Sequence, residues 1–255
     1  MSDVGPNYEY YNDDAENNRL DGEFRIWRGI GPYEGHPTVI LKNGRGYIPP
    51  LNRAKNVMIV NWVFEPSLHE IGIYLPNMPN VEELIIEECP GIFNINTLFM
   101  PKLKKLIIHK CGNLEKIKVN NLDKLHIRTC NKLDSVKVGG KVKKLHIDET
   151  TVTYIEGIID DLCLISCNSI ALLRNANILN SIFLRSCSIN ELPPELIELR
   201  ELHLLLCHNI TIIPEYPNIV SLTLVECLGV RKIQLPKTPK KLIVDSCPNL
   251  TLSSV

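Results

Sequence analysis

The sequence lacks several features that would assign it to a common functional class. Its net charge is −1 at pH 7, so no overall charge draws it to nucleic acid or to a membrane surface. No apolar run approaches the roughly 18 residues that a membrane-spanning helix needs. The first residues, MSDVGPNYEYYNDDAENN, are acidic and contain no apolar core. We therefore expect no signal peptide and a cytoplasmic, intracellular location.

Signatures of catalysis and of metal binding are also missing. The sequence contains no glycine-rich phosphate loop, no HExxH motif, no CxxC pair and no clear pair of catalytic carboxylates. His146 lies near Asp148, but no serine nucleophile or oxyanion site accompanies them. We expect no enzymatic activity, no cofactor and no metal.

The sequence does contain a repeat, which is complete once in LKKLIIHKC, residues 103–111. When each unit is numbered so that its cysteine is position 9, positions 1, 4 and 6 are aliphatic in all units, except for Pro239 at position 1 of the last. Steps between units are 22, 19, 20, 17, 20, 20, 20 and 20 residues. Position 9 is occupied in turn by Cys89, Cys111, Cys130, Thr150, Cys167, Cys187, Cys207, Cys227 and Cys247.

This LxxLxLxxC pattern resembles the short form of the leucine-rich repeat, and it covers residues 79–255. The resemblance implies a repeat solenoid of about nine units, mostly β, with a parallel β-ribbon and little helix. It also implies a role in recognising other macromolecules. The abundance of isoleucine and asparagine resembles the composition of amoebae and their large DNA viruses, so a viral source is one expectation.

Three regions are expected along the chain. Residues 1–22 predict a disordered acidic tail, since they carry few aliphatic side chains. Residues 23–78 predict an atypical N-terminal cap or degenerate repeats, with Val57, Ile59 and Trp62 at positions 4, 6 and 9. Residues 79–255 form the array, with one short helix at Pro194–Arg200. Strands are predicted in the cap at Phe24–Trp27, Val39–Leu41, Val57–Val60 and Ile71–Leu75.

Eight of the nine cysteines share one repeat position, which predicts a column of buried, reduced thiols at the turn that leaves each strand. A metal-binding or redox array is the alternative, and the missing CxxC pairs argue against it.

Side chains at positions 3, 5 and 7 of each strand are expected to point outward on one face, because 4 and 6 point into the core. Residues 102–144 hold thirteen Lys or Arg against three acids. Lys105, Lys124 and Lys144 fall on adjacent strands, where like charges repel. A partner with negative charge would explain them: an acidic protein surface, the acidic tail of this chain, or nucleic acid. A solvated, lysine-rich surface is the alternative.

Two further groups lie on the same face. His126, His146 and Cys163 share position 5 on successive units, which suggests exposed histidines with a pH-dependent charge, or less readily a metal site without a fourth ligand. The later units place apolar residues outward, Phe183 and Leu205 among them, as in an interaction surface.

The sequence therefore predicts a non-catalytic protein-binding scaffold or adaptor that uses its strand face. Nucleic-acid binding through the basic residues is the alternative, although the face lacks interleaved aromatic residues. The candidate partner-binding residues are Lys105, His109, Lys124, His126, Arg128, Lys144, His146, Phe183, Arg185 and Leu205.

The last strand of the array, Lys241–Ser246, is expected to be an open sheet edge. Lys240, Lys241 and Asp245 supply charges that discourage pairing there. The alternative is that a partner or a second copy of the chain covers this edge.

Overall fold

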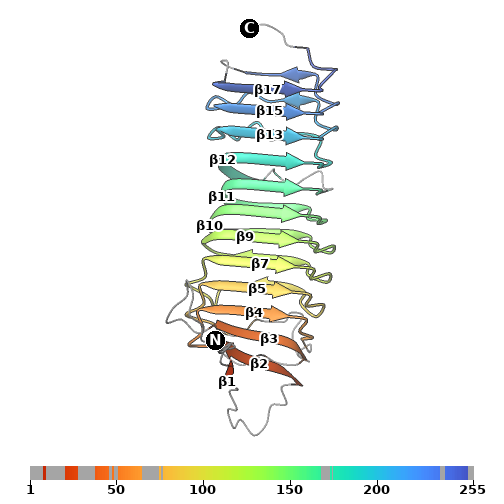
Figure 1. The fold of residues 1–255 in the computed structure, drawn as a ribbon. Helices are drawn as coiled ribbons and strands as arrows, with labels where there is room; N and C mark the ends of the chain where they lie inside the picture. Colours follow the sequence, from red (N-terminus) through yellow and green to blue (C-terminus); the bar gives the residue numbers. More distant parts are fainter. Residues whose placement is uncertain are drawn as a thin grey trace, which may run out of the picture.

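The chain winds into a column of parallel strands (Figure 1). The computed structural model describes residues 8–9, 21–27, 38–45, 48, 51–64, 75, 77–167, 173, 175–235 and 239–251. Each turn of the chain, here called a coil, adds one strand to a continuous front sheet. The result is a parallel β-solenoid of about nine turns with repeats of about 20 residues.

The front sheet begins with an antiparallel segment and continues in parallel. β1 and β2 pair antiparallel, β2 pairs antiparallel with β3, and every later neighbour is parallel. The strands that stack along this sheet are β1 (Tyr8–Glu9), β2 (Asp21–Trp27), β3 (Thr38–Arg45), β4 (Asn56–Val60), β5 (Glu83–Glu87), β7 (Lys105–His109), β9 (Leu122–Arg128), β10 (Ser135–Asp148), β11 (Tyr154–Ile165), β12 (Asn175–Arg185), β13 (Glu201–Leu205), β15 (Ser221–Val225) and β17 (Lys241–Asp245).

The opposite wall of the column is also built of strands, and we call it the back sheet. β6 (Asn94–Asn96) and β8 (Lys116–Val119) pair there, and β8 continues onto the first residues of β10. β10, β11 and β12 are long because each starts in the back wall and bends into the front sheet, with register shifts between Lys137 and Lys141 and between Ile159 and Asp161. Further along, β14 (Ile212–Ile213) pairs with β16 (Lys232–Ile233).

The bend within β11 depends on Gly157. Its φ is +117°, a conformation that side chains rarely adopt. A Cβ atom at this position would lie 2.3 Å from the carbonyl oxygen of Val138 on the neighbouring strand. This glycine therefore lets the shortest coil, the 17-residue step from Thr150 to Cys167, pass closely over the coil below.

Each front strand ends in the same turn. Position 8 is left-handed in every unit, with φ of 50–56° from Glu88 to Ser246, although none of these residues is glycine. The cost of about 1–2 kcal/mol for such a residue is offset locally. The position-8 N–H donates to the next coil, as from Glu88 to the His109 carbonyl at 3.0 Å. The bend also turns the cysteine at position 9 inward, where its Sγ donates to the carbonyl two residues earlier at 3.2–3.5 Å.

The predicted thiol column is confirmed: the position-9 cysteines are free and buried from Cys89 to Cys227, while Cys247 is partly exposed. Burial raises the pKa of Cys130 to about 12 and that of Cys227 to about 11, so these thiols stay protonated. Thr150 fills the same place, with its Oγ1 3.8 Å from the Cys167 sulfur.

The predicted early repeat is also confirmed. Val57 pairs with Leu84 and Ile59 with Ile86, and Val57, Ile59 and Trp62 are all buried. Phe24–Trp27, Val39–Leu41 and Val57–Val60 fall within β2, β3 and β4. Of Ile71–Leu75, only Leu75 lies within the described residues, and it is not in a strand. Of the predicted tail, Tyr8, Glu9, Asp21 and Gly22 are described, all in strands, and the rest lies outside the described residues.

The helix predicted at Pro194–Arg200 is wrong. This segment forms two successive turns that place Leu196 and Leu199 in the core. The spacing of apolar residues in PELIELR is compatible with two successive turns as well as with a helix. No helix occurs among the described residues, so none there is long and apolar enough to cross a membrane.

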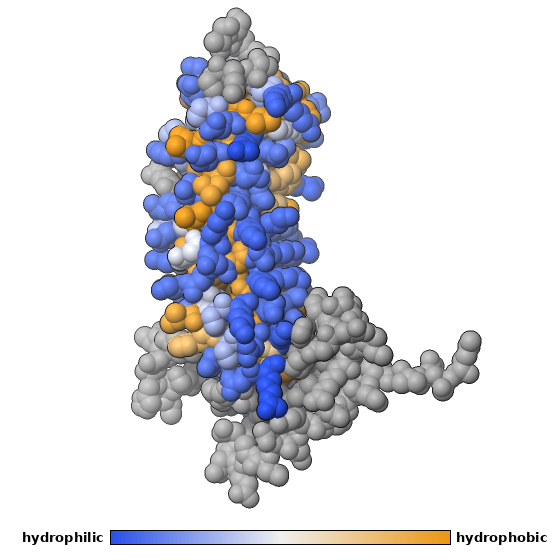
Figure 2. All heavy atoms as spheres, turned by 90° about the vertical axis from the view of Figure 1, so that its left-hand side faces the viewer, coloured by the Kyte–Doolittle hydropathy of each residue, from blue (hydrophilic) through white to orange (hydrophobic). Residues whose placement is uncertain are grey.

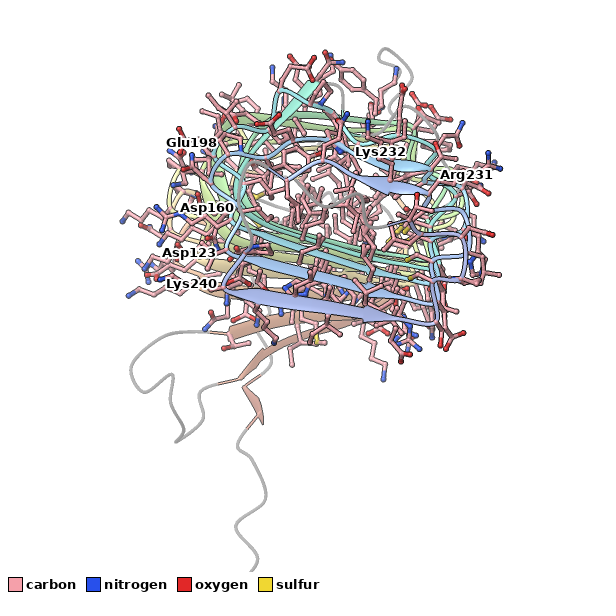
Figure 3. All side chains as sticks on the ribbon, turned by 90° about the horizontal axis from the view of Figure 1, so that it is seen from above. Asp123, Asp160, Glu198, Arg231, Lys232 and Lys240 are labelled. Carbon is pink, nitrogen blue, oxygen red and sulfur yellow. The ribbon has the colours of Figure 1, made fainter. Side chains whose placement is uncertain are left out.

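Inward side chains fill the space between the two walls. From above, apolar side chains occupy the interior, whereas the labelled Asp123, Asp160 and Lys240 point outward from the side where the front strands begin (Figure 3). This core continues from coil to coil, and positions 4 and 6 are 0–1% exposed from Leu84 to Leu224.

Candidate functional site

All ten predicted partner-binding residues lie on the outward side of the front sheet, which we call the front face. The alternation of half-buried and buried residues in β5, β7 and β13 confirms that positions 3, 5 and 7 point outward. Strand pairing aligns each of these positions into a column along the solenoid. The front face is therefore a flat surface crossed by three parallel columns of side chains.

The position-3 column contains the predicted lysines. Lys105 pairs with Lys124, and Lys124 with Lys144, on adjacent strands. The Lys105 ammonium forms an ion pair with Glu83 on the preceding coil. Among the described residues, Lys124 and Lys144 have no ion-pair partner. Two adjacent cations are therefore left on this column.

Most of the basic segment is neutralised by acids on neighbouring coils. Lys143 lies 2.6 Å from Asp123, and Lys141 lies 2.8 Å from Asp160. The other basic side chains with a carboxylate within 4 Å are Lys104, Lys105, Lys110, Arg128 and Lys137. Their partners, apart from Asp123, lie outside residues 102–144, so a charge count over that segment overstates its local charge.

Three histidines form a cluster at the middle of the front face. The His126 ring stands edge-on to His109, with ring centroids 5.1 Å apart, and lies at 30° to His146, with centroids 4.5 Å apart. The Nε2 atoms of His109 and His146 are buried, and no hydrogen-bond partner for them occurs among the described residues. The cluster is therefore packed as a stack of three imidazole rings.

Burial lowers the pKa of His126 to about 4, and the charges of His146, His109, Lys124 and Arg128 act in the same direction. Burial also lowers the pKa of His146, while Asp148 opposes that shift. The sequence predicted exposed histidines that change charge near neutral pH, and this is wrong for His126. Stacking within the column covers the rings, which a single strand pattern does not reveal.

His126 and His146 belong to a longer position-5 column, the central column, whereas His109 lies at position 7 of its strand. His146 pairs with Cys163, Cys163 with Phe183, and Phe183 with His203. Phe183 and His203 have ring centroids 6.5 Å apart. Burial raises the pKa of Cys163 to about 11, so its thiol remains protonated. The central column is thus a half-buried strip of rings and apolar side chains.

The position-7 column adds charge beside this strip. Arg128 lies 3.3 Å from Asp148 and 3.9 Å from Glu149, so its charge is shared with two carboxylates. Arg185 is exposed on β12 and pairs in register with the half-buried Leu205. Polar and apolar groups therefore alternate within one face, as at protein interfaces.

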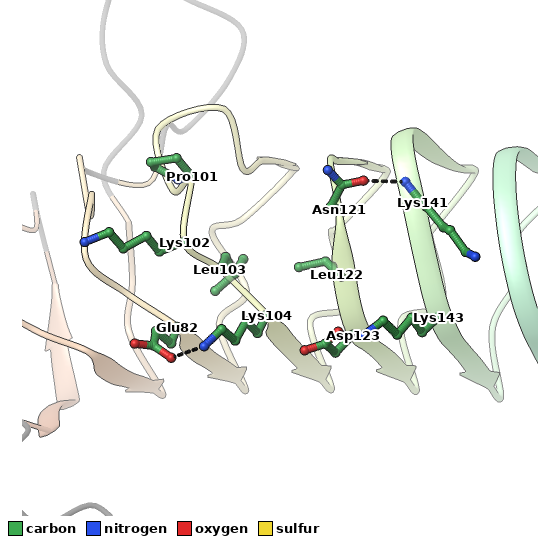
Figure 4. A pocket seen from close by; sticks show the side chains of 10 residues that line it. All are labelled: Glu82, Pro101, Lys102, Leu103, Lys104, Asn121, Leu122, Asp123, Lys141 and Lys143. Carbon is green, nitrogen blue, oxygen red and sulfur yellow. Dashed lines mark hydrogen bonds and ion pairs between the residues drawn. The ribbon is translucent and has the colours of Figure 1, made fainter.

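A second feature, not predicted from the sequence, lies where the front strands begin. This side is mostly hydrophilic (Figure 2). Position 2 alternates in charge over five coils, and the sequence signal that could have revealed it is the order Glu82, Lys104, Asp123, Lys143 and Asp160. A depression of about 600 Å³ lies between residues 101–104, 121–123 and 141–143 (Figure 4).

The charged groups of this depression are already engaged. Lys104 lies 2.6 Å from Glu82, and Lys102 donates to the Asn80 side chain at 2.7 Å. The Asn121 amide oxygen accepts the Lys141 backbone N–H at 2.8 Å. The polar groups of the depression therefore connect neighbouring coils to one another.

No group of three or more His, Cys, Asp or Glu in the described part of the chain is placed to hold a metal ion. The class defined by these observations is a β-solenoid with one patterned front face. Compared with family models, curated proteins and solved structures, the chain matches none of them.

Proposed function

We propose that this chain is a non-catalytic scaffold whose front face binds a protein partner. The observation that carries the proposal is the central column, where two isoleucines, two imidazole rings, the protonated Cys163 thiol and the Phe183 ring follow one another from Ile85 to Phe183. Flat faces with a half-buried apolar centre and a polar rim are typical of protein interfaces. Aromatic and imidazole rings there lose little conformational freedom when a partner covers them.

The proposal includes the resemblance to leucine-rich repeats. It is supported by one front strand in each unit of about 20 residues and by leucine or another aliphatic residue at positions 4 and 6. The position-9 cysteine supports it too, since its Sγ satisfies a carbonyl of the turn. The back wall consists of short strands and turns, which fits the shortest repeats of this kind.

The unpaired Lys124 and Lys144 define the kind of partner. They stand beside the central column, so a partner with acidic side chains next to an apolar centre complements both features. The nucleic-acid alternative loses support, because seven of the thirteen basic side chains of residues 102–144 lie within 4 Å of a carboxylate. Proteins that bind nucleic acid through its phosphates use more unpaired basic side chains than this face offers.

The test compares two charge-reversed variants of the full chain as baits in cell lysate treated with nuclease. One carries Lys105→Glu, Lys124→Glu and Lys144→Glu on the front face. Its matched control carries Lys116→Glu, Lys118→Glu and Lys137→Glu, which make the same charge change on the back sheet.

A protein retained by wild type and by the control but lost from the front-face variant supports the proposal. Retention by both variants contradicts it. A signal that nuclease removes and salt weakens steeply favours nucleic acid instead.

A further inference from the structure

The outer edge of β17, the last strand of the front sheet, is a second candidate binding surface. β17 pairs with β15 on one side, and no strand among the described residues lies on its other side. Leu242 and Val244 are 39% and 38% exposed, whereas Leu222 and Leu224 at the same positions one coil earlier are 0% exposed. This coil therefore presents core side chains to solvent.

The hydrogen bonds of the sheet determine which backbone groups face outward at this edge. The Lys241 N–H donates to the Val220 carbonyl at 3.1 Å, and the Asp245 carbonyl accepts the Glu226 N–H at 2.9 Å. Because backbone groups alternate in direction along a strand, the N–H and C=O of Leu242 and Val244 point away from β15. The Lys240 carbonyl and the Ser246 N–H are in the positions of Val220 and Glu226, which bind the next coil.

We propose that a second copy of this chain pairs with β17 in antiparallel orientation, with a two-fold axis at Ile243 perpendicular to the front sheet. Leu242 of each copy then lies opposite Val244 of the other and exchanges both backbone hydrogen bonds with it. The Ser246 N–H of each copy donates to the Lys240 carbonyl of the other. All the outward-pointing groups of the strand find partners in this register.

The charged residues of β17 favour the same register. Residues 241–245 read KLIVD, so the dyad at Ile243 places Lys241 of each copy opposite Asp245 of the other. Opposite charges in such cross-strand pairs are favourable, and like charges are unfavourable. A shift by two residues places Lys241 opposite Ile243 or Cys247 and loses both pairs. Lys241 and Asp245, the charged residues expected to discourage pairing at this edge, are thus complementary to the same strand of a second copy.

The apolar surfaces also match. A two-fold axis perpendicular to the sheet keeps each front face on the same side and each interior facing the same way. Leu242 and Val244 of both copies then continue one core, together with the partly buried Cys247 and Leu250. Ile243, which is 40% exposed on the front face, meets Ile243 of the second copy. Isologous contacts of this kind close on themselves and give a dimer rather than a filament.

The test is sedimentation equilibrium of the full chain from roughly 1 to 200 µM, which spans the affinities of modest interfaces. Wild type should show a monomer–dimer equilibrium. Lys241→Asp and Asp245→Lys each create two pairs of like charges and should weaken dimerisation on the order of tenfold. Lys144→Asp, the same kind of reversal on the front face, should leave it unchanged.

Mixing the two edge variants gives the sharper result. One carries only acidic and the other only basic side chains at these two positions, so the mixture should form a heterodimer with nearly wild-type affinity. Val244→Pro removes an N–H at the free edge and none that binds β15, so it should dissociate the dimer while circular dichroism stays unchanged.

A monomer at every concentration overturns the proposal. It is also overturned by dimers that ignore the charge variants, by a mixture that fails to recover affinity, or by a series of larger species.

Discussion

The coils from β5 to β11 and the coils of β13 and β15 have closely similar interiors and different exteriors. Leu106 and Ile108 in the first group are as fully buried as Leu202 and Leu204 in the second. Outside, ion pairs connect the first group from coil to coil, whereas the one comparable contact in the described residues of the second lies within β13, between His203 and Glu201. The inner positions specify the solenoid, and the outer positions are free to differ.

The energies of the two kinds of contact explain this freedom. A fully buried leucine contributes several times more to stability than an exposed ion pair, which is worth about 0–1 kcal/mol. The fold can therefore tolerate almost any outward residue. Outward clusters such as the histidines are then better explained by what they contact than by a need of the fold.

The largest expected effect tests whether the interiors are equivalent. Leu106→Ala and Leu204→Ala should each lower the free energy of unfolding by about 3 kcal/mol, since both leave a cavity in a closed core. Leu242→Ala should cost less than about 1 kcal/mol, because that side chain is already 39% exposed. Urea unfolding followed by circular dichroism measures all three. A loss at Leu204 much smaller than that at Leu106 would contradict a uniform core.

A smaller effect, on the pH dependence of stability, is expected from the histidine cluster, which the later coils lack. Because the folded-state pKa of His126 is about 4, the folded chain binds fewer protons than the unfolded chain between that value and about 6.5. Stability should therefore fall as the pH is lowered through this window and level off below it. We expect a loss of roughly 1–2 kcal/mol, discounted because the ring is partly exposed.

The charged and titratable groups that act on His126 are His109 on β7, Lys124 and Arg128 on β9, and His146 on β10, and Asp148 acts on His146. His126→Phe keeps the stack and removes this ionisation, so its plot of unfolding free energy against pH should be flatter over that window. His208→Gln removes an exposed histidine outside the cluster and should keep the wild-type slope. Equal slopes for wild type and His126→Phe would rule out His126 as the cause.

The smallest effect concerns the ion pairs. Lys104→Met removes the contact with Glu82 and should leave the urea midpoint of unfolding nearly unchanged, with any difference vanishing at 1 M salt. Urea unfolding at low and high salt measures it. A clear fall of the midpoint at both salt concentrations would mean that the charged residues at position 2, rather than the core, stabilise the first group of coils.

The sequence was sufficient to predict what repeats. Positions 4, 6 and 9 revealed the coils, the buried thiols and even the early coil at Val57 and Trp62, because burial imposes the same side-chain types each time. The sequence was insufficient where the environment of a residue depends on side chains from neighbouring coils. The acid partners of Lys141 and Arg128 lie outside the charged segment, and the low pKa of His126 depends on rings from neighbouring strands. The helix predicted at Pro194–Arg200 was wrong because apolar spacing alone does not distinguish a helix from a series of turns.

Every coil leaves its front strand through a left-handed residue at position 8. Each coil contacts only its neighbours, so a force along the long axis should peel the column one coil at a time rather than rupture it at once. Each event would release about 20 residues, or about 70 Å of extended chain. Single-molecule extension should then show evenly spaced steps of that length, and one cooperative rupture would contradict it. Pulled along its strands, the same molecule would have to break many parallel ladders together.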